Sequence, residues 1–272
     1  MNARATTRQW LSFHLFLCSH FDEFLVDHLA PALQERTAPG SPGRFFFIRY
    51  GEGGTHLRLR FRPRYEGFET RLGIWLQQIV NKFTADMPSV RLEAYTYDRK
   101  TLYFGETIAS VYSELLNEQT SWLAIHVMRA AERSQAKSFC LLVAILSAIF
   151  RSISLDSSDA ITRHWRAFTI EELRRLPIFP EPFPSAVNSI LPTHISKLLN
   201  PIAEGTSVHR EIRRIAALIR RTLRIPRGLF VATHALHLLC NKVGLSLQHE
   251  FWIAEALDTT CVEKRCYGEI DV

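Results

Sequence analysis

The sequence has few of the residues that mark disulfide-rich or metal-binding proteins. Its five cysteines are an odd number in 272 residues, and they are widely scattered. Cys18, Cys140 and Cys240 lie in apolar runs, which is typical of reduced core residues. Cys261 and Cys266 are spaced like half of a metal site or a disulfide, but no matching His or Cys pair lies nearby. We therefore expect no bound metal.

Long hydrophobic runs are also missing. The most apolar segment, Ser138 to Phe150, is far shorter than the about 20 residues that a membrane-spanning helix requires. The apolar run after Arg8 is interrupted by His14, His20 and several acidic residues. This interruption argues against a secretory signal peptide, so we expect a cytoplasmic protein without membrane segments.

The remaining composition is that of a globular protein with a sizeable core. Hydrophobic residues make up 47% of the chain and charged residues 22%, and the net charge of +6 favours an anionic partner. No internal repeat is visible, and the proline-rich segment 177–192 is typical of an extended surface connection. We expect one domain over 1–272, with a disordered tail at about 258–272.

Hydrophobic periodicity predicts an α+β fold. Apolar runs and an alternating pattern indicate strands at 10–17, on both sides of the Gly51–Gly54 turn in 44–63, and at 90–97. Helical patterns follow Ser19-x-x-Asp22 as a capping signal, and cover about 66–84, 107–152, 206–224 and the segment from Pro226 to Gly244. The order predicts an antiparallel sheet with packed helices, followed by a helix-rich C-terminal half.

One predicted strand is basic at every second residue. His56, Arg58, Arg60 and Arg62 project from one side of it, because alternate residues of a strand share a face. This pattern fits the solvated face of an antiparallel sheet. It fits equally a cleft in which guanidinium groups bind a carboxylate or the carbonyls of a peptide.

A second cluster lies on a predicted apolar helix. His234, His237 and Asn241 have the i, i+3, i+7 spacing of one helical stripe. A histidine in that setting is typical of a hydrogen-bonded core residue, and it can also serve as an oriented proton donor or acceptor. No further ligand stands at zinc spacing, so a zinc site is not expected.

Two other features carry chemical groups. Tyr97 and Tyr103 flank the end of a strand near a turn glycine, where a tyrosine packs or donates a hydrogen bond to a developing anion. The predicted helix 206–224 is rich in arginine, which fits a solvated face or a surface that binds an acidic segment. The chain lacks interleaved aromatic residues and a nucleic-acid motif, which argues against a nucleic-acid partner.

Together these clusters resemble the C-terminal, elimination-type domain of lantibiotic dehydratases, which also occurs as small free-standing proteins of thiopeptide biosynthesis. The family's FFIRY-turn-HLRLR block is matched by residues 46–50 and 56–60, after a Trp-led strand at Trp10. Its Tyr-x-x-Glu-x-x-Arg-Tyr-Gly-Gly block is matched loosely by 97–106, and its His-Met-x-x-Asn-Arg-Leu block by 237–243. The resemblance implies a stand-alone member that acts on a ribosomally synthesised peptide, alongside other enzymes of its pathway.

The resemblance implies two alternative activities. One eliminates glutamate from glutamylated Ser or Thr, and the other joins two dehydroalanines in a formal [4+2] cycloaddition that builds a pyridine or dehydropiperidine macrocycle. Tyr103 stands where eliminating members have Arg, and Lys100 stands where they have Glu. Loss of one arginine weakens a carboxylate clamp, so we favour the cycloaddition. A non-catalytic peptide- or RNA-binding protein is the third alternative.

The favoured activity assigns roles by resemblance. Arg58 and Arg60 would bind peptide carbonyls, His237 would move a proton with Asn241 orienting it, and Tyr103 would donate to a developing oxygen anion. The remaining substrate-binding candidates are Arg49, His56, Tyr97, Arg99, Asn241 and His234. The candidates for binding an acidic leader segment are Arg210, Arg213, Arg214, Arg220 and Arg221. Neither cofactor nor metal is implied, and the oligomeric state stays open, a homodimer included.

Overall fold

The computed structural model describes residues 10–17, 19–35, 44–51, 54–62, 68–84, 90–97, 107–176 and 206–267, with 107, 155 and 258–267 described by their backbone alone. The chain divides into two compact units, residues 1–99 and 100–272. The first is a sheet with helices and the second is helical, so the predicted α+β class is confirmed. In the described part of the chain, no helix is long and apolar enough to cross a membrane.

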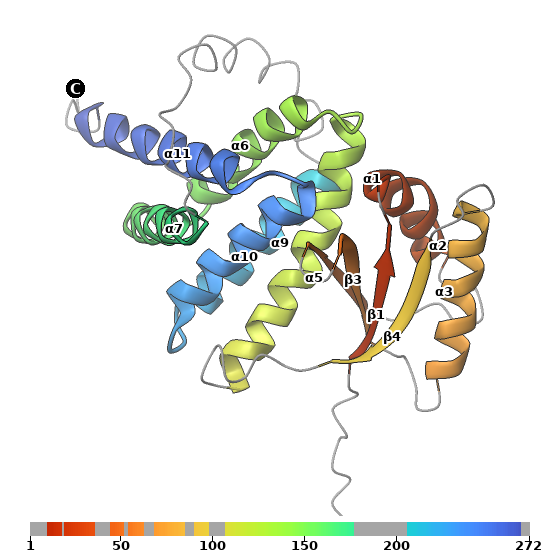
Figure 1. The fold of residues 1–272 in the computed structure, drawn as a ribbon. Coiled ribbons are helices and arrows are strands. Elements are labelled where there is room, and N and C mark those ends of the chain that lie inside the picture. Colours follow the sequence, from red (N-terminus) through yellow and green to blue (C-terminus); the bar gives the residue numbers. More distant parts are fainter. Residues whose placement is uncertain are drawn as a thin grey trace, which may run out of the picture. The chain divides into compact units, whose positions relative to one another are not determined.

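The first unit is built on a four-stranded antiparallel sheet (Figure 1). Its strands are β1 (Leu11–Phe16), β2 (Arg44–Tyr50), β3 (His56–Arg62) and β4 (Arg91–Thr96), in the order β2-β3-β1-β4. β2 and β3 form the predicted hairpin, whose turn contains Gly54 at φ 103°, a conformation that favours glycine. The chain therefore places the basic strand β3 in the interior of the sheet, between β1 and β2.

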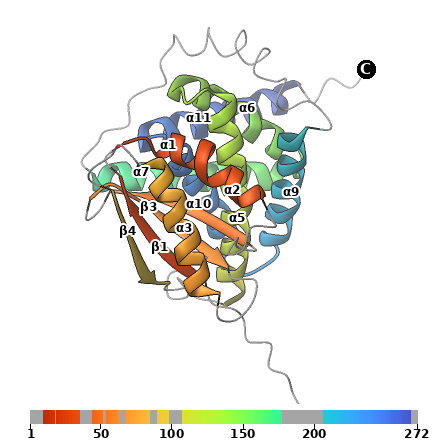
Figure 2. The same cartoon turned by 90° about the vertical axis from the view of Figure 1, so that its right-hand side faces the viewer.

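Helices cover one face of this sheet (Figures 1 and 2). They are α1 (Phe21–Glu23), the π-helical turn η1 (Phe24–Leu29), α2 (Ala30–Gln34) and α3 (Glu69–Phe83). Leu57, Leu59 and Phe61 of β3 are fully buried, and the ring of Phe61 meets Trp75 of α3 edge-on at 6.1 Å. The alternation predicted for the strand therefore supplies the core on this side.

The start of the first helix differs from the prediction. The helix begins at Phe21, and the residue before it, His20, adopts a left-handed conformation with φ 66° and makes no capping hydrogen bond with its side chain. The capping signal assigned to Ser19 is therefore wrong. The turn is closed instead by the backbone, since Phe24 N donates to the carbonyl of His20.

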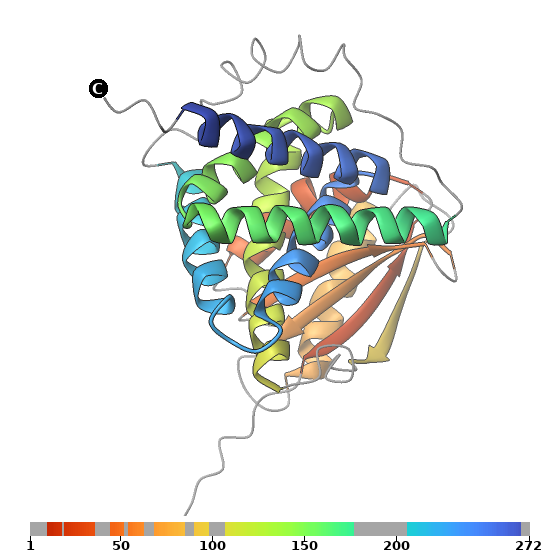
Figure 3. The ribbon, with the colours of Figure 1, turned by 90° about the vertical axis from the view of Figure 1, so that its left-hand side faces the viewer.

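The second unit is a bundle of helices (Figure 3). They are α5 (Thr107–Ala130), α6 (Gln135–Arg151), α7 (Leu155–Arg175), α9 (Ser207–Thr222), α10 (Gly228–Val243) and α11 (Leu247–Tyr267). α5 packs against α9 and α10, while α7 packs beside α11 and α10. The polar network around His237, described below, comes from the three-helix group of α7, α10 and α11.

The helical pattern predicted over 107–152 is interrupted in the structure. Glu132 and Arg133 have positive φ angles of 51° and 62°, and they separate α5 from α6. Two helices, α7 and α11, were not predicted individually. The proline-rich segment 177–192 lies outside the described residues, and α11 continues to Tyr267, into the segment where a tail was expected.

Glycines fix both ends of α10. A Cβ atom on Gly228 would lie 1.9 Å from the carbonyl oxygen of Thr222, so the close turn from α9 into α10 admits only glycine. At the other end Gly244 has φ 81°, as the predicted C-terminal stop requires. The register of α10, and with it the position of His237, is therefore set by its two boundaries.

Candidate functional site

The basic side of β3 is not the fully solvated face that one interpretation of its pattern predicted. His56 is 2% exposed and Arg60 is 9% exposed, while Arg58 is half-buried. The register places His14 of β1 opposite Arg58, and Ser12 of β1 opposite Arg60. Guanidinium and imidazole groups from two strands therefore share one largely buried surface.

Aromatic rings stack along this surface. His14 lies between Tyr95 of β4, at 3.9 Å between ring centroids, and His56, at 4.9 Å. The Arg58 Cζ atom lies 3.2 Å from the ring centroid of Tyr50, a cation–π contact. We call the surface formed by these residues with Arg60, Trp10, Ser12, Phe46 and Tyr97 the aromatic–basic face.

Hydrogen bonds define the tautomer of His56. Its Nδ1 lies 2.6 Å from the carbonyl oxygen of Gly54, which can only accept, so Nδ1 carries the proton. Its Nε2 then accepts from Nε of Arg58 at 3.2 Å. His56 therefore aligns the Arg58 guanidinium, and the Gly-rich turn aligns His56.

Burial and the charges on this face leave one histidine neutral. Burial, followed by the charges of Arg60 and Arg58, lowers the pKa of His14 to about 4. Burial and the neighbouring Arg58 also lower the pKa of Arg60 to about 10, so its guanidinium remains charged near neutral pH. The face thus combines permanent cations with an uncharged imidazole.

Several hydrogen-bond donors on this face have a long hydrogen bond or none within the described residues. The hydrogen bond of Arg60 within the described residues is a long one, 3.4 Å from Nη1 to the carbonyl oxygen of Leu59. Trp10 Nε1 and Ser12 Oγ are buried and meet no hydrogen-bond partner among the described residues. Buried polar groups normally have partners, so these three groups suit a ligand rich in acceptors, such as a carboxylate or a peptide carbonyl.

The structure separates some of the predicted site residues. Arg49 lies on the opposite face of the sheet, where it pairs with Asp22 and stacks on Phe21. Tyr97 does lie on the aromatic–basic face, with its ring centroid 5.5 Å from the Arg60 Cζ atom. Arg99 and Tyr103 lie outside the described residues.

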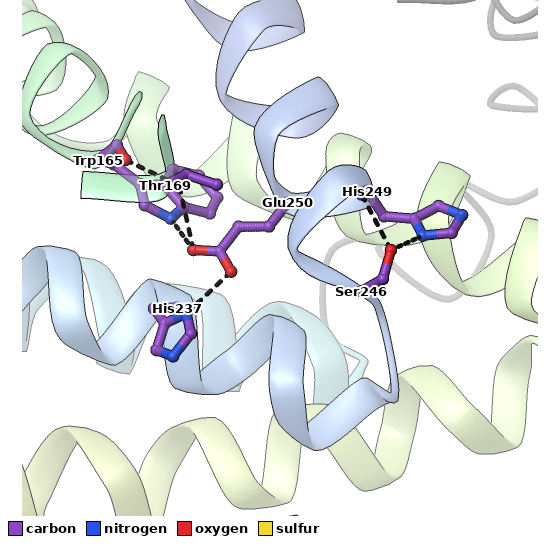
Figure 4. A network of polar contacts seen from close by, with 6 residues as sticks. All are labelled: Trp165, Thr169, His237, Ser246, His249 and Glu250. Carbon is purple, nitrogen blue, oxygen red and sulfur yellow. Dashed lines mark hydrogen bonds and ion pairs between the residues drawn. The ribbon is translucent and has the colours of Figure 1, made fainter. Parts of the chain in front are cut away.

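The helical unit places a carboxylate against His237 (Figure 4). The His237 side chain on α10 is 23% exposed, and its Nδ1 lies 2.9 Å from Oε2 of Glu250 on α11. The other carboxylate oxygen, Oε1, accepts from Trp165 Nε1 at 2.5 Å and lies 3.4 Å from Thr169 Oγ1, both on α7. Three helices therefore converge on one buried carboxylate.

Glu250 was missed in the sequence. Asn241 was expected to orient His237, whereas the structure gives Glu250 that position and leaves Asn241 half-buried on the next turn of α10. One signal was available, because Ser246 caps α11 by accepting from His249 N. A helix that starts at this cap places Glu250 in its first turn. Nothing local, however, predicts that this turn packs against α10.

His234 lies beside the pair. It is 7% exposed, its ring centroid lies 5.9 Å from that of His237, and its other side stacks on Phe230 at 6.2 Å. The predicted stripe of His234 and His237 therefore exists, with His234 largely buried. Among the residues that the structure describes, no group of three or more His, Cys, Asp or Glu side chains could hold a metal ion.

The basic helix was predicted correctly as α9, and its arginines differ in their environments. Arg210, Arg213, Arg214, Arg220 and Arg221 are all exposed. Arg214 pairs with Glu211 on the same helix, and Arg220 donates to the carbonyl of Ser152 at 2.6 Å. Arg220 therefore also fastens α9 to the end of α6.

A family model, the C-terminal domain of lantibiotic biosynthesis dehydratases, matches residues 10–261. The chain therefore belongs to the lantibiotic dehydratase C-terminal family. The match spans the aromatic–basic face and the His237–Glu250 pair. No curated protein sequence matches the chain.

Solved structures share the fold. A tRNA-dependent lantibiotic dehydratase, MibB from Microbispora sp. 107891, has a TM-score of 0.61 at 19% identity, covering 100% of this chain and 29% of MibB. TbtD, a pyridine synthase from thiomuracin biosynthesis, has a TM-score of 0.52 at 14% identity over 96% of this chain and 99% of its own. TsrL has a TM-score of 0.55 at 17% identity over 95% of both chains. The chain thus spans less than a third of MibB, and at these identities the likeness concerns the fold alone.

Proposed function

We propose that this protein joins two dehydroalanines of a leader-bearing precursor peptide by a formal [4+2] cycloaddition, forming a pyridine or dehydropiperidine macrocycle. The observation that carries the proposal is the aromatic–basic face. Flat, conjugated dehydroalanine amides can stack on its rings, while its under-used donors bind their carbonyl oxygens.

The balance of the reaction shows which groups it needs. The amide N–H of one dehydroalanine passes its proton to the preceding carbonyl oxygen, which creates a 2-azadiene. Two carbon–carbon bonds then form: one joins the two CH₂ carbons, and the other joins the amide carbon to the α-carbon of the second dehydroalanine. The cycloadduct is a hydroxylated dehydropiperidine with one C=N bond; loss of water converts it to a dihydropyridine, and loss of the leader as its carboxamide then gives the pyridine. The protein must therefore move protons and orient two alkenes.

The described residues offer both kinds of group. Arg58 and Arg60 would stabilise the carbonyl oxygen as it gains the character of an imidate. Within the helical unit, the proposed proton carrier is His237, which Glu250 holds in place. His56 would hold Arg58 in place rather than bind the peptide itself.

The small number of arginines placed to bind a carboxylate also favours cycloaddition over elimination. A glutamyl carboxylate calls for several guanidinium groups, but Arg49 is paired with Asp22 on the far side of the sheet. Tyr103 moreover replaces the arginine of eliminating relatives. A cycloaddition needs no such clamp.

Glutamate elimination remains the second candidate, and one observation favours it. Arg60 is a buried cation with one long hydrogen bond within the described residues, and Arg58 lies two residues away on the same face. This pair would attract a carboxylate. In that reaction a base removes the α-proton of the glutamylated residue, the β carbon–oxygen bond breaks, and glutamate leaves.

The leader of the precursor would bind to α9. Its exposed arginines form a basic surface, and Arg213 has no ion pair among the described residues. A leader rich in Asp and Glu is the matching partner. The other enzymes of the pathway would supply the dehydrated peptide.

Mass spectrometry on two synthetic peptides tests the proposed reaction. One peptide is glutamylated at Ser, and the other carries two dehydroalanines at macrocyclic spacing. We expect cyclised product, with loss of water and of leader, from the second only. Loss of glutamate from the first, without product from the second, would replace our proposal with the elimination.

A substitution at Tyr103 sharpens the same choice. Tyr103→Arg would restore a carboxylate contact, so an eliminating enzyme should tolerate it. In a cyclising enzyme it places a permanent charge where an uncharged phenol is proposed, and turnover should fall by about 100-fold. Tyr103→Phe is the control, since it removes only the hydroxyl.

A further inference from the structure

Glu250 is a buried carboxylate that receives hydrogen bonds from two different helices (Figure 4). We infer that Glu250 and Trp165 are positioning residues that hold His237 in the tautomer with its proton on Nδ1 and its lone pair on Nε2. The reaction served by this tautomer rests on the proposed function, but the tautomer itself does not.

The donor and acceptor inventory leads to this tautomer. An indole N–H can only donate, so the 2.5 Å contact assigns Oε1 of Glu250 to Trp165. The second oxygen, Oε2, then faces Nδ1 of His237 at 2.9 Å. A carboxylate oxygen can only accept, so the proton lies on Nδ1.

Burial makes the arrangement rigid. Trp165 and Thr169 are fully buried, and Glu250 is 2% exposed. The Thr169 hydroxyl has a shorter bond, 2.9 Å, to the carbonyl of Trp165, so its single proton is engaged there rather than with Glu250. Trp165 is therefore the donor that fixes which carboxylate oxygen faces His237.

Neighbouring rings limit rotation of the imidazole. Phe168 meets it edge-on at 5.2 Å, and His234 lies at 5.9 Å with its plane tilted by 33°. The carboxylate would also stabilise the imidazolium that forms when Nε2 takes a proton, and this attraction is stronger in a poorly solvated setting. Both candidate reactions require such a proton carrier, so the inference does not depend on which one is correct.

Glu250→Gln is the decisive substitution. Because Trp165 can only donate, the Gln oxygen stays with Trp165 and its NH₂ group turns toward His237. That NH₂ group donates to Nδ1 and drives the proton onto Nε2. We expect the nitrogen-15 signals of the His237 ring to exchange their protonated and unprotonated positions, and turnover to fall by about 100-fold.

Trp165→Phe, combined with Glu250→Gln, distinguishes a positioning role of Trp165 from a purely structural one. Without the indole donor, the Gln of a Glu250→Gln/Trp165→Phe double variant can rotate and present its oxygen to Nδ1. We expect the double variant to regain the wild-type tautomer, and to be about tenfold more active than Glu250→Gln alone. A merely destabilising effect would make the double variant worse than either single variant.

Glu255→Gln is the matched control, because it makes the same change on the same helix at a residue paired with Arg166. It should leave the His237 spectrum unchanged.

Two outcomes overturn the inference: a wild-type His237 protonated on Nε2, or a His237 tautomer and turnover that Glu250→Gln does not alter. If Glu250→Gln does not fold, the nitrogen-15 spectrum of the wild-type His237 ring still shows whether the proton lies on Nδ1. A wild type that turns over neither peptide yet shows the Nδ1 proton would defeat the proposed function and leave this inference intact.

Discussion

Each unit of the protein buries a cation, and the two cations have different surroundings. Lys242 in the helical unit is fully buried, and its Nζ donates to Asn117 Oδ1 at 2.8 Å, to Thr120 Oγ1 at 2.7 Å and to the Asn117 carbonyl at 3.2 Å. Arg60 in the sheet unit is 9% exposed and has one hydrogen bond of 3.4 Å within the described residues. The same kind of charge is thus well satisfied in one place and under-used in the other.

This difference separates a structural charge from a functional one. Burial lowers the pKa of Lys242 well below its ordinary value, and its hydrogen bonds join α10 to α5. A buried cation with few partners, by contrast, destabilises the fold unless a ligand completes its contacts. Arg60 is therefore expected to matter for activity, and Lys242 for stability.

The largest effect is expected from Arg60→Met. Turnover of the dehydroalanine peptide should fall by about 1000-fold, since a charge-assisted contact to the reacting carbonyl is lost. The free energy of unfolding should stay the same or rise, because a desolvated charge is removed. Kinetics and urea unfolding measure the two quantities.

Arg91→Met is the matched control on the same sheet. Arg91 stacks on Phe16, but its side chain is 63% exposed and pairs with Glu93. It should change turnover by less than about threefold. The comparison fails if Arg60→Met destabilises the protein strongly while its folded fraction keeps wild-type turnover.

A second effect concerns the dependence of stability on pH at His14. Its pKa is about 4 in the folded protein, against 6.5 when unperturbed, so the unfolded chain binds more protons between these values. The stability contribution is present above pH 6.5 and is lost as the pH falls toward 4. Between pH 6.5 and pH 4, His14 lowers the free energy of unfolding by up to about 3 kcal/mol, and His14→Phe should abolish this decrease.

Urea unfolding at pH 7, 5.5 and 4 measures the effect at His14, with the parent protein as reference. The difference in unfolding free energy between parent and variant should change in favour of the variant as the pH falls. Parallel pH profiles would show that burial and the neighbouring guanidinium groups do not lower the pKa of His14 in the folded protein.

A third effect is expected at Lys242. Lys242→Met leaves the oxygen atoms of Asn117 and Thr120 without their buried donor, so the free energy of unfolding should fall by about 2 kcal/mol. Turnover per folded molecule should be unchanged. Lys82→Met, at an exposed lysine of α3, should leave both quantities as they are. A loss of activity without a loss of stability would contradict the structural role of Lys242.

The smallest effect is expected at exposed arginines. Replacing Arg213 and Arg214 by Glu should weaken binding of the full-length precursor by about tenfold, and leave binding of a leaderless core peptide unchanged. The same double change at Arg174 and Arg175, the exposed end of α7, alters the net charge equally and is the control. Equal losses for precursor and core peptide, measured by fluorescence anisotropy, would remove α9 as the leader surface.

Much of the fold follows from local patterns. The alternation in β3, the glycine turn before it and the stop at Gly244 all appear in the structure as predicted. The prediction was weaker where a helix has no strong local signal. α7 and α11 were not predicted, and they carry Trp165 and Glu250. The half of the His237 network that sequence reasoning missed therefore lies on those two helices.

The sequence by itself determined which residues share a strand face or a helix stripe, because these relations depend only on the periodicity of the backbone. It therefore placed Arg58 with Arg60, and His234 with His237. Only the tertiary structure decided that Arg49 turns to Asp22, that Lys242 reaches Asn117, and that His237 meets Glu250. These contacts join different elements across the fold, and the packing of helices and strands, rather than any local preference, brings their atoms within reach.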